Sequence, residues 1–353
     1  MHRLTKRLDF NFKDTNTIFS LINEIDKLNT LFSLDTKLSP QSIKRLTQSI
    51  IITSSGASNR IEGNRLTNEE IEALYKKINI KNFKTRDQQE VAGYVEVLEM
   101  IFESFEGMNF NEGLILQLHE MMLKYTPEAT RYRGVYKIGP NRVEARDKEG
   151  KLIKVIFNPT EPGLTPIEMH DLLERTQKSF EEKELHPLLI IGNFLFEFLA
   201  IHPFQDGNGR ISRLLTNLLL LQQGFNFMSY VSHESLVEKR KVDYYIALGK
   251  AQQTRKTEKE NIFSRMEFFL QILKEQANQA IMLADGKDIR MFLTDKQLVV
   301  RDHISEHYPC SRKEIVEATG LAEGTVKQII NKLIDMKKII RRGGGRGVRY
   351  EIV

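Results

Sequence analysis

Residues 202–213 read His202-Pro-Phe-Gln-Asp-Gly-Asn-Gly-Arg-Ile-Ser-Arg213, and this stretch decides the fold. The segments on either side of it, 188–200 and 211–223, are apolar on nearly every face of a helix. Helices of this kind belong in the middle of a bundle, because a helix at the surface keeps one polar face. The sequence therefore predicts a mainly helical protein in which a short polar loop joins two central helices.

The residue types in this loop favour an anion-binding site. Gly207 and Gly209 allow backbone amides to approach a phosphate closely, and a helix that starts near Arg210 points its positive end at the same place. Arg210 and Arg213 are three residues apart on one side of that helix. Both guanidinium groups can therefore hold further phosphate oxygens.

Two more side chains of the loop bring reactive groups. Asp206 can supply one oxygen to a hydrated Mg²⁺ ion whose other ligands are phosphates and water. His202 is the only group nearby with a pKa suited to general base catalysis near neutral pH. Taken singly, each residue also has a purely structural explanation: the histidine as a helix cap, the glycines as a turn and the arginines as surface charge.

Taken together, residues 202–213 match the signature His-Pro-Phe-x-(Asp/Glu)-Gly-Asn-Gly-Arg-x-x-Arg of the Fic family at every fixed position. The chain resembles this family over roughly residues 58–274. The resemblance implies a helical core with the motif in a loop between two central helices. It also implies an enzyme that transfers the AMP part of ATP to a Ser, Thr or Tyr hydroxyl of a protein.

The resemblance assigns roles within the loop. His202 would deprotonate the hydroxyl that attacks the α-phosphorus, and Asp206 would hold Mg²⁺, or Mn²⁺ in its place, on the α- and β-phosphates. Phe204 would anchor the loop by packing. The residues implied to bind the phosphates of ATP are Gly207, Asn208, Gly209, Arg210 and Arg213.

Two further features acquire an expected role from the same resemblance. Residues 141–157 alternate in polarity around the turn-forming stretch 147–150, which predicts a β-hairpin. In the family such a hairpin is a flap to which an extended protein target adds as a strand, whereas the alternative is a plain surface hairpin. Tyr244 and Tyr245 are similar to tyrosines that border the nucleotide, and they would flank the adenine unless they belong to the core or its rim.

An upstream stretch, Ser58-Asn-Arg-Ile-Glu-Gly63, fits the family's inhibitory motif (Ser/Thr)-x-x-x-Glu-(Gly/Asn). The resemblance implies that Glu62 pairs with Arg213 and occupies the place of the γ-phosphate of ATP, which would make it a brake. The alternative is that Ser58 caps a short helix that Gly63 ends. Whether Glu62 also assists the removal of AMP from targets stays open.

Helix starts are visible elsewhere in the sequence. Thr67 with Glu70, and Thr165 with Glu168, each have the spacing of a capping box, in which the first side chain caps the helix and the second reaches back. Pro166 would occupy the first helical position after Thr165. We therefore expect helices to begin at these two threonines.

Residues 294–353 form a separate pattern. Capping boxes begin at Thr294 and Ser311, a short turn at Gly320 precedes a helix over 322–336, and a strand, a loop rich in glycine and arginine, and a second strand follow. The order resembles a winged helix-turn-helix. Twelve basic and eight acidic residues give this segment +4 of the chain's net charge of +5, which favours an anionic partner such as DNA. Winged helices also bind proteins, so both partners stay open.

Composition limits the class of protein. The 353 residues predict two or three domains, and a single cysteine, Cys310, excludes an internal disulfide framework. The first twelve residues lack the apolar core of a secretory signal. The most apolar stretch, 188–204, is interrupted by polar residues, so it does not predict a membrane span. We therefore expect a cytoplasmic protein that does not bind a membrane.

The expected organisation is a helical region over 1–110 with the inhibitory helix around 58–63, a Fic core over 111–275, a linker over 276–293 and a winged helix over 294–353. The expected function is Mg²⁺-dependent adenylylation of a protein hydroxyl, on a target or on the chain itself, under the control of Glu62. The alternatives are a DNA-binding regulator whose Fic domain senses nucleotide, and a Fic enzyme that removes AMP or uses another phosphate-containing donor. The target, the modified residue and the oligomeric state, a homodimer included, stay open.

Overall fold

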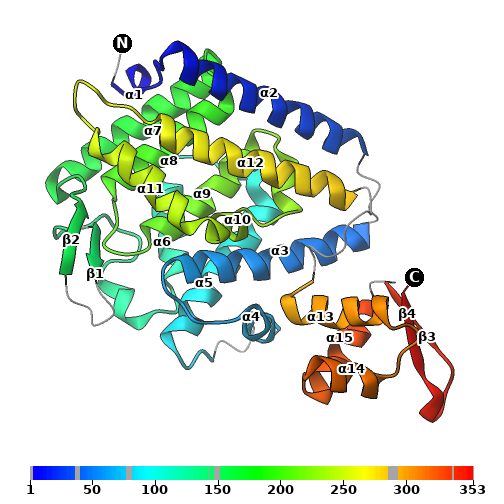
Figure 1. The fold of residues 1–353 in the computed structure, drawn as a ribbon. Coiled ribbons are helices and arrows are strands. Elements are labelled where there is room, and N and C mark those ends of the chain that lie inside the picture. The colour runs from blue at the N-terminus through cyan, green and yellow to red at the C-terminus, as the bar shows by residue number, and fades with distance from the viewer. Residues whose placement is uncertain are drawn as a thin grey trace. The chain divides into compact units, whose positions relative to one another are not determined.

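The computed structural model describes residues 3–35, 40–76, 82–141, 143–146, 152–284, 293–335 and 338–352. The chain forms two compact units, Met1–Asp285 and Gly286–Val353. The first unit is mainly helical, as expected (Figure 1). In chain order its α-helices are α1 (Arg3–Lys6), α2 (Phe12–Asp35), α3 (Pro40–Ile61), α4 (Asn68–Tyr75), α5 (Arg86–Ser104), α6 (Glu112–Met122), α7 (Thr165–Glu182), α8 (Pro187–Ile201), α9 (Asn208–Gln222), α10 (His233–Lys239), α11 (Lys241–Gln253) and α12 (Phe263–Ala284).

Helices α8 and α9 form the centre of this unit. They pack on each other, and α8 also contacts α7 and α12 while α9 contacts α5. From Leu188 to Ile201 every residue of α8 except Asn193 is buried. Each buried leucine or phenylalanine contributes roughly 1.5–3 kcal/mol through removal of apolar surface from water, so this pair supplies much of the core. The prediction of two central helices around the 202–213 loop is confirmed.

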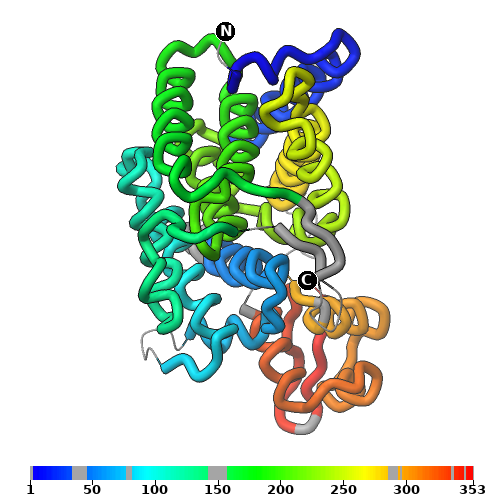
Figure 2. Tube along the Cα trace, turned by 90° about the vertical axis from the view of Figure 1, so that its left-hand side faces the viewer, coloured from blue at the N-terminus to red at the C-terminus, as the bar shows by residue number. Residues whose placement is uncertain are grey.

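The N-terminal helices pack directly against the central part. Helix α2 lies along α12, side by side in both Figure 1 and Figure 2, and α3 packs on α5 and α10. Arg7 in the segment after α1 is buried and pairs with Glu197 of α8 and with Glu260. Residues 1–110, expected as a region of their own, are therefore part of one compact unit with the core. Among the described residues every helix is too short or too polar to cross a bilayer.

The expected hairpin is present as strands β1 (Val143–Arg146) and β2 (Leu152–Phe157), which pair antiparallel. The expected turn over 147–150 lies outside the described residues. The register shifts twice along β1, between Val143 and Glu144 and between Ala145 and Arg146. Such irregularities bend a strand and increase its twist.

Both predicted helix starts are confirmed, but only one of the two capping boxes is formed. At Thr67 the hydroxyl accepts from the backbone N–H of Glu70, and the Glu70 carboxylate accepts from the N–H of Thr67. Helix α7 begins at Thr165, as predicted, but the Thr165 hydroxyl donates to the carbonyl of Glu161 and does not cap the helix. A 3₁₀ turn over Pro162–Leu164 precedes the helix, and Leu164 takes the N-cap position.

The linker expected over 276–293 begins too early. Helix α12 continues to Ala284, because Ala277, Ala280 and Leu283 are buried against the unit. An alanine-rich face with such burial keeps its helical hydrogen bonds rather than ending them. Residues 276–284 therefore belong to the first unit.

The second unit has the elements that the sequence predicts. Helices α13 (Asp295–Glu306), α14 (Arg312–Thr319) and α15 (Glu323–Asp335) precede the antiparallel strands β3 (Ile339–Arg342) and β4 (Arg349–Ile352). Both capping boxes, at Thr294 and Ser311, are formed. Apolar side chains from the three helices and from β3 make a core of their own, among them Val300, Ile304, Ile315, Val326, Ile330, Leu333 and Ile339.

Candidate active site

The loop between α8 and α9 is shaped by its two ends. His202 ends α8 with a left-handed backbone conformation, φ 54°, which is uncommon for a residue with a side chain. Gly207 is the N-cap residue of α9 and has φ 83°, where glycine is favoured, and an added Cβ would lie 2.7 Å from Met122 Cε. The chain therefore reverses within five residues and presents its polar groups between two helix ends.

Two side chains hold the loop from inside. Phe204 is completely buried and stacks on His119 with ring centroids 3.7 Å apart, so the prediction of an anchor is confirmed. Asn208 is buried as well, and its side-chain amide accepts from the backbone N–H of Phe204 and donates to its carbonyl, both at 2.8 Å. The Asn208 side chain was expected to face the phosphates, but in this structure it is used within the loop, because both ends of its amide are already bonded.

The imidazole of His202 is neutral, and its Nε2 is available to accept a proton. Nδ1 lies 3.3 Å from the carbonyl oxygen of Leu199. A carbonyl only accepts, so Nδ1 carries the proton and Nε2 has the lone pair. Nε2 makes no hydrogen bond to any residue that the structure describes. Burial lowers the pKa of His202 to about 4, and the charge of Lys137 acts in the same direction. This is the state that a general base requires at neutral pH.

Asp206 and Arg210 form the polar wall of the loop. Asp206 Oδ1 accepts from the N–H of Gly207 at 2.6 Å, and Oδ2 accepts from Arg210 Nη2 at 3.1 Å. The Asp206 side chain is 37% exposed, whereas that of Arg210 is 3% exposed. Within the described part of the chain, Arg210 Nε and Nη1 have no hydrogen-bond partner, although Nη1 lies 3.4 Å from a carboxylate oxygen of Glu90. Buried guanidinium donors without partners are suited to receive phosphate oxygens.

His119, on α6, supports the same wall and was not identified from the sequence. The N–H of Gly134 donates to His119 Nδ1 at 2.9 Å, so Nε2 carries the proton and donates to the carbonyl of Asp206 at 3.0 Å. Burial lowers the pKa of His119 to about 4. The only signal in the sequence was a lone histidine on an otherwise apolar helix face, which is too common to be informative.

Ser58 on α3 and Glu62, the residue directly after α3, contact Arg213 at the far end of the loop. Arg213 donates from Nη2 to Glu62 Oε1 at 2.7 Å and from Nε to the Ser58 hydroxyl at 2.7 Å. Arg213 Nη2 also donates to the carbonyl of Ser58 at 3.0 Å. The sequence-based prediction of a Glu62–Arg213 pair therefore matches the observed contact. The Arg213 side chain is 4% exposed and the Glu62 side chain is 37% exposed, so the carboxylate is accessible to solvent while the guanidinium is buried.

The Glu62 carboxylate also lies close to the backbone of the turn at Gly209. An added Cβ on Gly209 would meet Glu62 Oε1 at 2.3 Å, so a side chain here would displace the carboxylate. Desolvation opposes ionisation of Glu62, but the charge of Arg213 and its hydrogen bond hold the pKa of the carboxyl below its usual value. Glu62 is therefore negatively charged at neutral pH, at the end of the site formed by Gly209 and Arg213.

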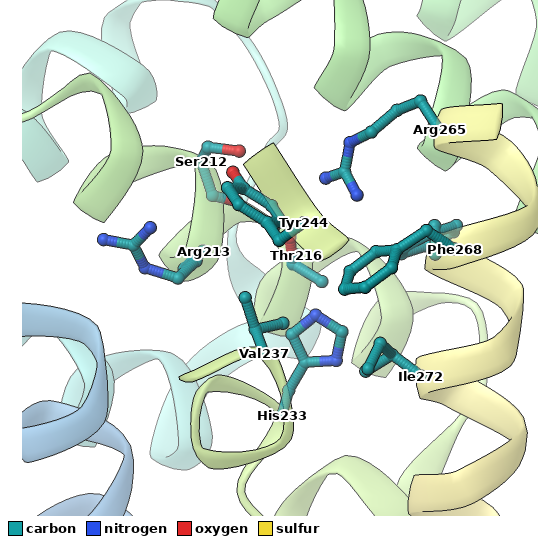
Figure 3. Close-up of a pocket in the computed structure, with 10 residues that line it drawn as sticks. Ser212, Arg213, Thr216, His233, Val237, Tyr244, Arg265, Phe268 and Ile272 are labelled. Carbon is teal, nitrogen blue, oxygen red and sulfur yellow. The ribbon is translucent and has the colours of Figure 1, made fainter. Parts of the chain in front are cut away.

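The structure separates the two tyrosines that were expected to flank adenine. Tyr244 is 4% exposed, and the guanidinium of Arg265 lies 4.8 Å from its ring centroid. Beside Tyr244 is a cavity of about 10 Å³, which holds about one water molecule and cannot hold a purine (Figure 3). Tyr245 is 43% exposed; partial burial raises its pKa, and the charge of Glu62 acts in the same direction. The prediction for Tyr244 is therefore corrected to a core role, and of the two tyrosines Tyr245 is the one accessible to a nucleotide.

Asp206 is the carboxylate of the loop that suits a hydrated metal ion. No group of three or more His, Cys, Asp or Glu side chains suited to a metal occurs among the described residues. Asp206 is one exposed carboxylate beside the turn that precedes α9. A hydrated Mg²⁺ ion held by one carboxylate and by substrate phosphates fits such a site, because Mg²⁺ keeps several waters.

Comparisons with known proteins agree with this geometry. Residues 109–220 match the model of the Fic/DOC family. The chain is 26% identical over 213 residues to the protein adenylyltransferase Fic of Nematostella vectensis. The matched segment covers 58% of this chain and 45% of that protein. It is 33% identical over 91 residues to a Fido domain-containing protein of Dictyostelium discoideum, which covers 23% of this chain and 64% of that protein. The chain thus spans less than half the length of the Nematostella protein.

Solved structures show the same fold. A Fic family protein from Desulfovibrio desulfuricans matches with a TM-score of 0.61 at 24% identity, over 96% of both chains. A Fic domain containing signaling protein from Bacteroides thetaiotaomicron matches with a TM-score of 0.60 at 23% identity, over 75% of this chain and 98% of that one. The protein therefore has a Fic-type fold. The family model and the curated relatives support a Fic/Fido domain over the segment that contains the 202–213 loop.

Proposed function

We propose that this protein transfers AMP from ATP to a Ser, Thr or Tyr hydroxyl, on a target protein or on itself. The observation that carries the proposal is the neutral His202, whose Nε2 is available at the end of an anion-binding turn that begins α9. The names of curated relatives, protein adenylyltransferase Fic, support a nucleotidyltransferase at the level of the family.

In the proposed reaction His202 Nε2 accepts the proton of the target hydroxyl. The hydroxyl oxygen forms a bond to the α-phosphorus of ATP, and the bond from that phosphorus to the oxygen bridging to the β-phosphate breaks. The products are an AMP-modified side chain and pyrophosphate. Negative charge moves onto the pyrophosphate, where the backbone N–H of Gly209 and the guanidinium groups of Arg210 and Arg213 stabilise it.

Asp206 is the residue we propose for holding Mg²⁺, or Mn²⁺, together with the phosphates. Bound there, the ion would supply positive charge to phosphate oxygens. The Asp206 carboxylate already accepts from Gly207 and Arg210, so its orientation is set in advance by this chain.

The cytoplasm is the compartment we propose, which agrees with a single, buried cysteine.

Glu62 is proposed to keep the enzyme slow. Its carboxylate pairs with Arg213 and lies against Gly209, so a third phosphate at this place would meet a negative charge and lose its own arginine. ATP would then bind with its α-phosphorus out of line for attack. Removal of the carboxylate should restore the productive arrangement.

The test is transfer of label from ATP with a radioactive α-phosphate, in the presence of Mg²⁺, onto the protein and onto a lysate. We expect Glu62→Gly to label about 10- to 100-fold faster than the wild type, which lies within the roughly 5- to 150-fold range that couplings of roughly 1–3 kcal/mol give. Glu62→Gly/His202→Ala should not label, because the base is lost. Glu128→Gly is a matched control, since Glu128 is exposed in the 3₁₀ turn Pro127–Arg131.

Two outcomes would contradict this proposal. Label transfer from ATP with a radioactive γ-phosphate, but not from the α-labelled form, would show that phosphate and not AMP is transferred. Loss of label from a pre-modified target with wild-type protein, but not with Glu62→Gly, would show that Glu62 assists AMP removal. The protein target is proposed to add as a strand to the β1–β2 flap, because a strand at the edge of a two-stranded sheet offers backbone hydrogen bonds to an extended segment.

A second candidate function belongs to Gly286–Val353. The three helices followed by β3 and β4 support a winged helix, and the exposed face of α15 carries Lys327, Gln328 and Asn331. Such side chains contact phosphates and base edges when a helix enters the major groove. A DNA-binding regulator, with the Fic domain as its nucleotide sensor, is therefore the alternative, and duplex binding by the full chain tests it.

A further inference from the structure

Residues 137–141 lie against the start of the catalytic loop, although they are far from it in sequence. The segment hydrogen-bonds four consecutive backbone carbonyls, those of residues 201–204, on both sides of His202. The donors and distances are Lys137 Nζ to Ile201 (3.0 Å), Asn141 Nδ2 to His202 (3.1 Å), Lys137 N to Pro203 (2.9 Å) and Asn141 Nδ2 to Phe204 (2.9 Å).

The two side chains also hold each other. Lys137 Nζ donates to Asn141 Oδ1 at 2.8 Å, so the asparagine amide must direct its Nδ2 to the loop. We call Lys137 and Asn141 the loop clamp. Lys137 Nζ and Asn141 Nδ2 thus both hydrogen-bond carbonyl oxygens at the end of α8 and just after it.

A buried lysine without a carboxylate partner is unusual at a purely structural contact. Lys137 is 3% exposed, and no carboxylate of the described residues lies within ion-pair distance of it. A buried ammonium without a counter-charge is unfavourable unless its donors are bonded, and here they bond loop carbonyls. Burial lowers the pKa of Lys137 to about 8, which leaves it mainly charged at pH 7. That charge is one of the causes of the low pKa of His202.

The position of the clamp in the chain links two parts of the site. Asn141 is followed after one residue by Val143, the first residue of β1. The flap therefore leaves the body of the protein from the same segment that holds the loop. His202 has a left-handed backbone, which persists only where the surroundings hold it, and the clamp bonds the carbonyls on both sides of it.

We infer that Lys137 and Asn141 are positioning residues, which set the place of the base His202 and connect the flap to the catalytic loop. The inference rests on the proposed function of His202. A clamp of this kind acts on the geometry of proton transfer, whereas the phosphates are held by the other end of the loop. Its loss should therefore reduce the rate of transfer more than the affinity for ATP.

The experiment uses the full chain with Glu62→Gly as the parent. Lys137→Met removes the charge and its bonds at similar length, Asn141→Leu removes the amide without a change of charge, and Lys178→Met is the control, since Lys178 is exposed on α7 and pairs with Glu182 of the same helix. We expect label transfer to fall at least about ten-fold in both clamp variants. The Kd of ATP, measured by titration calorimetry, should stay within about two-fold, and the control should match the parent.

The titration of His202, followed by NMR of its imidazole, separates the two clamp residues and does not depend on activity. Besides Lys137, the charged groups that act on His202 are Glu62 and Asp206, and Glu62 is absent from every one of these variants. Lys137→Met should raise the pKa of His202, and Asn141→Leu should change it less, because only the lysine carries charge.

Clamp variants that melt at the parent's temperature and label at the parent's rate would overturn the inference. An equal loss of ATP affinity and rate would also overturn it, because that would indicate general disorder of the site. If Lys137→Met does not fold, Asn141→Leu decides by the same two readouts. A parent that fails to label contradicts the proposed function instead, and an unchanged His202 titration in Lys137→Met would then still refute the clamp.

Discussion

At the scale of single residues, the site depends on imidazoles kept neutral by burial. His202 and His119 both have a pKa of about 4 in the folded protein, against about 6.5 in an unfolded chain. His119 must accept from Gly134 through Nδ1, and His202 must keep a lone pair on Nε2. Protonation would remove the acceptor lone pair from Nδ1 of His119 or from Nε2 of His202.

We expect stability to fall as pH decreases from about 6.5 toward about 4. In this window the unfolded chain binds protons that the folded imidazoles do not, so the stability present above pH 6.5 is lost. The full loss is about 3 kcal/mol per histidine once pH lies below 4. Thermal denaturation of the wild type and of His119→Gln across pH 4–8 measures it. A slope that is the same in both proteins would contradict the assignment to His119, whereas carboxylates such as Glu168 act mainly below pH 4.5.

At the scale of secondary structure elements, the end of α3 has to be held for Glu62 to reach the loop. Arg60, on the last turn of α3, donates from Nε and Nη2 to the two carboxylate oxygens of Glu238, at 2.7 and 2.9 Å. Its Nη1 donates to the carbonyl of Leu66 and to Asn68 Oδ1. These bonds connect α3 with α10 and with the start of α4.

We therefore expect Arg60→Gln to weaken the brake without a change in any residue that would contact ATP. A partly exposed pair of this kind contributes about 1 kcal/mol, so label transfer by the otherwise wild-type chain should rise about five-fold, less than with Glu62→Gly. Arg175→Gln, which removes an exposed pair with Asp171 on α7, is the control. Equal labelling by Arg60→Gln and the wild type would show that α3 is held without this pair.

At the scale of the whole molecule, the two units have separate cores and separate proposed partners. The 202–213 loop, the flap and Glu62 all belong to Met1–Asp285, and α15 with its exposed Lys327 belongs to Gly286–Val353. Changes on α15 should therefore alter nucleic-acid binding and leave label transfer unaffected.

For DNA binding we expect the affinity of the full chain for a duplex to fall steeply with salt, because binding to phosphates releases counterions. Lys327→Glu/Arg341→Glu should weaken binding and reduce the slope of log affinity against log salt by about 2, because each substitution removes the cation that neutralises one phosphate. Lys178→Glu/Lys250→Glu changes the charge equally in the other unit. Binding that is unaffected by salt and by the Lys327→Glu/Arg341→Glu variant would indicate a protein-interaction module.

Much of this protein was determined by the sequence alone. The apolar helices around 202–213, the hairpin, the capping boxes at Thr67, Thr294 and Ser311 and the elements of the second unit were all predicted, because they depend on local periodicity and on short motifs. The pairing of Glu62 with Arg213 was inferred because two distant segments, 58–63 and 202–213, both resemble motifs of the Fic family. The structure contains the contact.

Other features were decided only by tertiary structure, because they depend on what packs against a residue. Thr165 has the sequence of a cap but follows a 3₁₀ turn, Tyr244 faces the core while Tyr245 does not, and Asn208 uses its amide within the loop. His119, Lys137 and Asn141 belong to no motif, and they acquire a role only where α6 and the segment before β1 meet the loop. Burial and hydrogen-bond partners are set by residues far apart in the chain, and a local pattern does not contain them.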